Sequence, residues 1–177
     1  MSSLPQVQAA ATGGDTADAA HSRFVQRVRR RYEAELALLP PGLPDRAGLE
    51  ALIDRLHAGG RAPSAALRVA RHLVIERLAV EDCERDAPLD AVTRTMTLLA
   101  EVTLDRALAL AFAEHDAKHG APLKPDGSRS AFWVVGMGKL GARELNVSSD
   151  IDLIYVYDED VPTAGRADGS GVVSAHE

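Results

Sequence analysis

Apolar residues recur every three or four positions through most of the first 120 residues, which is the spacing of one face of an α-helix. The first run begins near Ala19 and stops before Pro40, so a single helix is predicted there. A short second run ends at Gly59, and a third ends near Ala87. The first helix is defined by Phe24, Val28, Tyr32, Leu36 and Leu39, and the second by Leu49, Leu52, Ile53 and Leu56.

The third and fourth helices begin beside residues that commonly cap helices. Ser64 is a candidate N-cap for the third helix and Asp90 for the fourth. The fourth apolar run continues to about His119, where Gly120 is a candidate stop. Its roughly 30 residues would span about 45 Å at 1.5 Å per residue. A helix of that length is typical of a strut along a bundle or between domains.

The pattern changes after residue 120. Prolines and a glycine mark a linker, and two short apolar runs, 132–135 and 151–157, predict strands. The second run is apolar on both faces, which predicts a strand inside a sheet. Two strands cannot bury their own faces, so an incomplete domain is expected. We therefore predict an α+β chain with a disordered tail (1–18), a helical bundle (19–120), a linker (121–129) and the start of a truncated α/β domain (130–177).

Composition narrows the class of protein. The chain has 177 residues, 46% of them hydrophobic, and a net charge of −6, which excludes wholesale disorder and argues against general nucleic-acid binding. The single cysteine, Cys83, excludes a disulfide framework. No apolar run is long enough to span a membrane, and no secretory signal is recognisable, so a cytoplasmic protein is expected.

Two aspartates carry the strongest chemical signal. Asp150 and Asp152 stand two positions apart at the start of the second predicted strand, where alternate side chains share a face. Adjacent carboxylates repel each other, and a divalent cation offsets that cost. Magnesium commonly binds one or two carboxylates together with substrate phosphates. The structural alternative is a pair of exposed charges that merely protects a strand edge.

A glycine-rich segment lies between the two predicted strands. Gly138 and Gly141 predict either a positive φ angle or a close backbone approach. Lys139 lies between them and Ser148-Ser149 directly precedes the aspartates, so an anion-binding loop is predicted beside the metal site. The spacing also fits a dinucleotide-binding fingerprint. Only nine residues separate Gly141 from Ile151, however, which is too few for the crossover helix of that fold.

Three short motifs together resemble a known family. Gly138-Lys139-Leu140-Gly141, Glu144-Leu145-Asn146 and the Ser-Ser-Asp-Ile-Asp-Leu run at 148–153 resemble the core of the glutamine synthetase adenylyltransferase/adenylyl-removing enzymes. The resemblance is dense over 134–157 and only architectural before that. It implies the first strands of a nucleotidyltransferase domain of the DNA polymerase β type. The Gly-Met-Gly-Lys form at 136–139, with Asn146 and Ile151 and the mostly helical residues ahead of it, resembles the N-terminal half of these two-half bacterial proteins.

The resemblance also implies a reaction and its partners. In this family the N-terminal half removes AMP from a tyrosine of adenylylated glutamine synthetase, using phosphate and releasing ADP. The other half attaches AMP from ATP. Glutamine synthetase and a PII-type nitrogen signal protein are therefore the expected protein partners, with ATP, ADP and phosphate as small ligands. Nucleic acid and membranes are not expected as partners.

Single residues match the family motifs. Asp150 and Asp152 match its catalytic, Mg²⁺-binding pair, Gly138 matches the glycine of a Gly-Ser turn, and Ser149 matches the serine before the aspartates. A third catalytic carboxylate, which the superfamily supplies from a later strand, has no candidate before Glu177, so the chain alone is expected to be inactive. The residues expected to bind nucleotide or phosphate are Gly138, Lys139, Gly141, Ser148 and Ser149.

Other interpretations stay open. A uridylyltransferase of the same superfamily is one, and a non-catalytic helical interaction module is another. His115 and His119 have the i, i+4 spacing of a metal-binding pair but also suit the end of a helix. Five arginines between residues 23 and 31 are expected to form a solvated surface that pairs with Glu33 and Glu35. The alternative is contact with an acidic partner or another domain.

Overall fold

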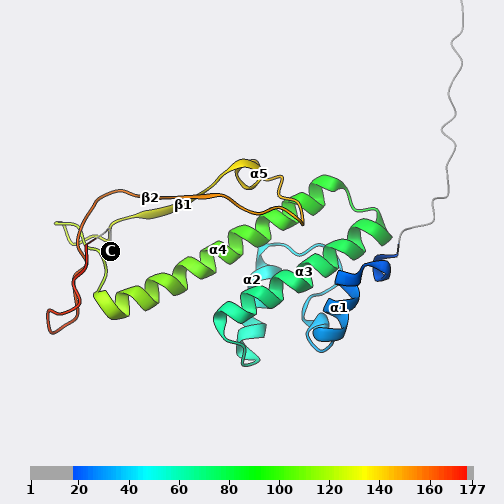
Figure 1. Ribbon diagram of the computed structural model, residues 1–177, viewed down its shortest axis with the longest axis horizontal. Helices are drawn as coiled ribbons and strands as arrows, with labels where there is room; N and C mark the ends of the chain where they lie inside the picture. The colour runs from blue at the N-terminus through cyan, green and yellow to red at the C-terminus, as the bar shows by residue number, and fades with distance from the viewer. Residues whose placement is uncertain (1–17, 175–177) are drawn as a thin grey trace, which may run out of the picture.

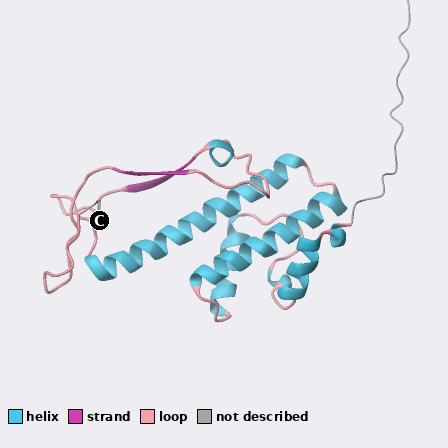
Figure 2. Ribbon diagram, in the orientation of Figure 1, coloured by secondary structure: helices cyan, strands magenta, loops and turns pink. Residues whose placement is uncertain are grey.

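The computed structural model describes residues 18–174, which form a group of helices followed by a two-stranded antiparallel sheet (Figures 1 and 2). This arrangement confirms the α+β class. Residues 1–17 of the predicted tail lie outside the described residues. The elements are η1 (Ala19–His21), α1 (Arg23–Arg31), η2 (Leu36–Leu38), α2 (Arg46–Ala58), α3 (Pro63–Arg85), α4 (Leu89–His119), β1 (Phe132–Gly136), α5 (Gly138–Gly141) and β2 (Leu153–Tyr157).

The single helix predicted between residues 19 and 39 is wrong, because α1 occupies only its middle. Ser22 interrupts the start of that run and caps α1, where its Oγ accepts a hydrogen bond from the Val25 N–H at 3.5 Å. The helix ends at Arg31, because the φ of −123° and ψ of 34° at the next residue, Tyr32, are not helical. The Tyr32 ring is buried and stacks on His72 of α3, with the ring centroids 5.6 Å apart. Packing against α3 therefore overrides the helical spacing of the apolar residues.

Helix α2 forms as predicted, but the two predicted N-caps are wrong. Helix α3 begins at Pro63, so Ser64 lies inside its first turn. Proline suits the first helical position because its φ is already fixed and its missing N–H would have no helical partner. Helix α4 begins directly after Pro88, and Asp90 lies in its first turn. There its carboxylate interacts favourably with the helix dipole without acting as a cap.

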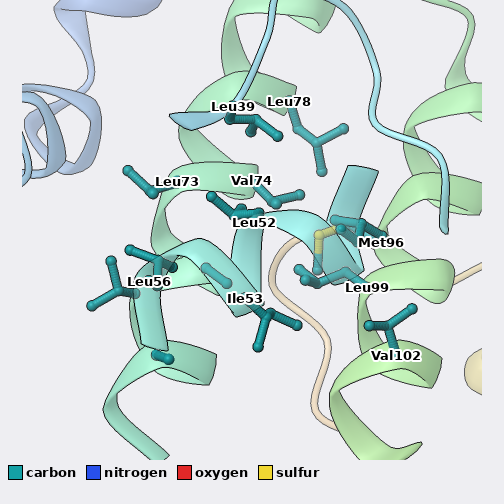
Figure 3. Close-up of a cluster of buried hydrophobic side chains, with 14 of the residues drawn as sticks. Leu39, Leu52, Ile53, Leu56, Leu73, Val74, Leu78, Met96, Leu99 and Val102 are labelled. Carbon is teal, nitrogen blue, oxygen red and sulfur yellow. The ribbon is translucent and has the colours of Figure 1, made fainter. Parts of the chain in front are cut away.

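The hydrophobic core lies where α2, α3 and α4 meet (Figure 3). Leu52, Leu73 and Val102, one from each helix, are each 1% exposed. Two residues from outside the helical region, Leu140 and Leu145, belong to the same buried cluster. The segment after β1 is therefore packed onto the helices.

Helix α4 links the two parts of the fold. It spans 31 residues and ends at His119 before Gly120, as predicted. One side packs against α2 and α3, and β1 lies along the helix (Figure 1). Phe112 contacts Phe132 of β1 edge-to-face at 5.7 Å between centroids. No helix within residues 18–174 is both long and apolar enough to cross a membrane.

The sheet differs from its prediction in two respects. Strand β1 pairs antiparallel with β2 from Phe132↔Tyr157 to Gly136↔Leu153, so β2 starts two residues later than predicted. Within the described residues, β2 has a strand neighbour on one side only, and Tyr155 is 61% exposed, so the prediction of a buried inner strand is wrong here. The apolar side chains of both strands that remain exposed are Trp133, Val135, Ile154, Tyr155, Val156 and Tyr157.

Asp158 fastens the end of β2 to the segment before β1. Its carboxylate accepts hydrogen bonds from Lys124 Nζ at 2.9 Å, Ser130 Oγ at 2.7 Å and the Ala131 N–H at 2.8 Å. These bonds, that from Lys124 above all, hold the pKa of Asp158 well below its usual range. The charged carboxylate thus joins two segments that are distant in sequence.

We expect Asp158 to make the stability of this region depend on pH. Its folded pKa lies below the unfolded value of about 4, so its contribution is present above that pH and is lost as the pH falls. Asp158→Asn should lower the free energy of unfolding near neutral pH and flatten its decline toward about pH 3. Urea unfolding across this range measures both effects. Glu114→Gln, an exposed change on α4, serves as the control; equal pH slopes in wild type and Asp158→Asn would contradict this role.

Candidate functional site

The glycine loop, residues 136–145, follows β1 and uses its glycines in two different ways. Gly138 has a φ of +52°, and a Cβ there would meet nothing within 4 Å. A Cβ on Gly141 would lie 2.5 Å from the Gly136 carbonyl oxygen, so Gly141 is required for close packing. The positive φ angle predicted from the sequence is therefore found at Gly138, and the close backbone approach at Gly141.

The glycine loop is fixed to α4 by apolar and polar contacts. Leu140 and Leu145 are 7% and 3% exposed within the core cluster. The buried Leu145 N–H donates to Thr97 Oγ1 at 3.2 Å, and the Arg143 guanidinium pairs with Glu101 at 3.0 Å. The loop is thus held in place by side chains of α4 that sequence motifs did not single out.

Asn146 shapes the turn that leads to the aspartates. Its Oδ1 accepts hydrogen bonds from Ser148 Oγ at 3.1 Å, Ser149 Oγ at 2.8 Å and the Ser148 N–H at 3.2 Å. Both serine hydroxyls therefore direct their hydrogens at Asn146 in this arrangement. Sequence reasoning gave Asn146 no role of its own, although an asparagine two residues before a serine is a recognised turn signal.

Asp150 and Asp152 are both exposed, and neither side chain has a hydrogen-bond or ion-pair partner within the described part of the chain. The Met137 N–H donates to the Asp152 carbonyl oxygen at 2.9 Å, which continues the strand ladder and places Asp152 beside the start of the glycine loop. Both aspartates nevertheless precede β2. The predicted strand therefore starts at Leu153, after both aspartates, and a shared face for the two carboxylates stays a prediction.

The clefts next to the glycine loop do not contain the aspartates. One cleft, of about 670 Å³, lies between α4 and β1 and is lined in part by Glu101 and Arg143. A second, of about 590 Å³, is lined in part by Arg94 and Glu144. Residues 18–174 therefore expose the two carboxylates without enclosing them.

The donor set at the aspartates fits a hard cation with few protein ligands. Among the described residues no cluster of three or more His, Cys, Asp or Glu side chains could hold a metal ion. Two carboxylates without partners provide what Mg²⁺ needs when waters and substrate phosphates complete its octahedron. Lys139 is exposed on the glycine loop, without an ion-pair partner in residues 18–174.

The histidine pair on α4 is a weaker candidate for metal binding. The rings of His115 and His119 are 4.9 Å apart between centroids, as the spacing predicts. Nδ1 of His119 is already hydrogen-bonded to the Gly171 carbonyl at 2.9 Å. With no cluster of three possible ligands in the described residues, the pair remains an alternative without support.

Comparison with known proteins identifies the class and then the family. Residues 19–175 match a family of adenylyltransferases. The match includes the helical region, the glycine loop and the carboxylate pair. The matching family model is that of glutamate-ammonia ligase adenylyltransferase. Because the match covers most of the chain, this protein belongs to the glutamate-ammonia ligase adenylyltransferase family.

Several similar proteins are named bifunctional glutamine synthetase adenylyltransferase/adenylyl-removing enzyme. Those of Burkholderia pseudomallei and Burkholderia mallei are each 51% identical over 138 residues, which is 75% of this chain and 15% of theirs. That of Ralstonia nicotianae is 40% identical over 166 residues, or 89% of this chain and 17% of its own. The chain therefore spans less than a fifth of the length of these relatives.

The hydrogen bond between Leu145 and Thr97 can be tested directly. Thr97→Val keeps the side-chain shape and leaves the buried Leu145 N–H without an acceptor, so we expect a loss of about 1–3 kcal/mol in unfolding free energy. Exchange of the Leu145 amide hydrogen should accelerate. Thr93→Val, which removes an exposed hydroxyl from the same helix, should change stability by less than about 0.5 kcal/mol. Unchanged exchange at Leu145 in Thr97→Val would show that the bond does not anchor the loop.

Proposed function

We propose that this chain forms part of the adenylyl-removing half of a glutamine synthetase adenylyltransferase/adenylyl-removing enzyme. Family membership and the names of the relatives support glutamine synthetase as the protein substrate. The resemblance of the glycine loop and aspartate motifs to the N-terminal half supports the direction of the reaction. The observation that carries most weight is the exposed, partner-free Asp150 and Asp152 beside a glycine loop fixed to α4.

The proposed reaction is phosphorolysis. An oxygen of inorganic phosphate forms a bond to the phosphorus of the tyrosine-bound AMP, and the bond between that phosphorus and the tyrosine oxygen breaks. The products are ADP and a tyrosine whose oxygen takes up a proton. ATP, from which the other half would attach AMP, and a PII-type regulator belong to the proposal for the whole protein.

The chain's own residues would bind and orient the reactants. Asp150 and Asp152 would hold Mg²⁺, which when bound supplies positive charge against the phosphate oxygens. Lys139 would attract the same anions from the open side of the glycine loop. The serines at 148 and 149 act mainly through Asn146, because their hydroxyl hydrogens already point to it. Their expected role thus becomes shaping of the turn that presents the aspartates.

The test uses a chimera in which residues 19–175 replace the matching segment of the Burkholderia pseudomallei relative. Release of ADP from adenylylated glutamine synthetase is measured as a function of phosphate. Asp152→Asn removes a metal-binding charge, so the rate should fall at least about 100-fold while the unfolding midpoint is retained.

Glu114→Gln in the same chimera is the matched control, since it removes an exposed carboxylate of α4 that lies outside the candidate site. Its rate should equal that of the unsubstituted chimera. An Asp152→Asn chimera that releases ADP at nearly the unsubstituted rate would overturn the assignment of these aspartates to the reaction.

A further inference from the structure

The arginines of α1 are not neutralised as the sequence predicted. Glu35 pairs with Arg61, which belongs to the segment after α2. Glu33 has no ion pair within the described residues. Only Arg29 of α1 has an acidic partner there, the buried Glu76 of α3, at 2.7 Å. The predicted pairing with Glu33 and Glu35 is therefore wrong, and most of the positive charge of α1 stays uncompensated.

Helix α3 adds two more arginines without an acidic partner to those of α1. All six are exposed, and in residues 18–174 none has a carboxylate oxygen within 4.0 Å of its guanidinium. Their spacing of three or four residues along each helix aligns them on one face of it. We call this surface the arginine face; it consists of Arg23, Arg27, Arg30 and Arg31 of α1 with Arg68 and Arg71 of α3.

Arginines from both helices lie near His72. Its ring contacts the Phe24 ring of α1 and the ring of Tyr32, which follows α1, with centroids 6.0 and 5.6 Å away. Burial lowers the pKa of His72, and the charges of Arg71, Arg31 and Arg27 lower it further. Guanidinium groups from both helices are therefore close enough to act on one imidazole.

The composition of the arginine face favours a protein partner. The face presents six arginines, a residue type enriched at protein interfaces, and arginine is also the commonest basic residue of the whole chain. The planar guanidinium also matches carboxylates with two parallel hydrogen bonds. Nucleic acid is disfavoured because the whole chain carries a net charge of −6 and α1 and α3 expose no large aromatic side chain for base stacking.

We propose that the arginine face docks an acidic surface of the protein substrate, at a distance from the glycine loop. This inference rests on the proposed function for the identity of the substrate, glutamine synthetase. Helix α1 packs on α3, whereas the glycine loop and β1 lie along α4, so the two surfaces belong to different parts of the fold (Figure 1). Contact at a second place would orient a large protein substrate without taking part in the chemistry.

The first test is binding of the 177-residue chain to immobilised adenylylated glutamine synthetase. The triple variant Arg27→Ala/Arg31→Ala/Arg71→Ala should bind about tenfold more weakly, and the wild type should lose affinity steeply with salt. The control Arg94→Ala/Arg106→Ala/Lys118→Ala removes the same charge from α4 and should bind as the wild type. Equal weakening by both triples, or tighter binding of wild type to duplex DNA than to the enzyme, would overturn the proposal.

A kinetic test separates docking from chemistry. In the chimera, the arginine-face triple should raise KM for adenylylated glutamine synthetase about tenfold and leave kcat unchanged, because docking affects encounter and affinity alone. An active chimera whose KM is unaltered by the triple would refute docking and leave the proposed function standing. A chimera that releases no ADP would instead count against the proposed function, while the binding assay would still decide on docking.

Discussion

The attachment of the glycine loop to α4 is the constraint on which the candidate site depends. A four-residue helix such as α5 has too few internal hydrogen bonds to be stable alone. The burial of Leu140 and Leu145 in the helical core, with the Thr97 hydrogen bond, fixes its position. Because Asp152 pairs through its backbone with Met137 at the start of the same loop, this attachment also fixes where the carboxylate pair lies. The helical region thus acts as the platform of the site.

Much of the fold could be predicted from hydrophobic spacing. The C-terminal ends of α2 and α4 follow from glycines after periodic leucines, and β1 follows from its short apolar run. The misplaced elements have one tertiary and one local cause. Tyr32 leaves its helix to stack on His72. Pro63 at the first position of α3 and Pro88 directly before α4 mark the helix starts where serine and aspartate caps were expected. Hydrophobic spacing alone records neither cause.

The candidate site was predictable in its chemical groups and less so in its geometry. The separate requirements for Gly138 and Gly141 were legible in the sequence, as was the carboxylate pair. The roles of Thr97 and Glu101 were not, because these residues lie more than 40 positions away on a helix that gives no chemical signal. The exposed apolar face of the β1–β2 sheet and the open surroundings of the aspartates show what residues 18–174 alone leave uncovered.

Paramagnetic broadening by Mn²⁺, a substitute for Mg²⁺, tests most directly whether the aspartates form a metal site. In nuclear magnetic resonance spectra of the 177-residue chain, low Mn²⁺ should broaden the amide signals of Asp150, Ile151 and Asp152 first, then those of Met137 and Gly138. Asp150→Ala/Asp152→Ala should abolish this pattern. Broadening centred on His115 and His119, or uniform weak broadening that the double variant leaves unchanged, would contradict a cation site at the glycine loop.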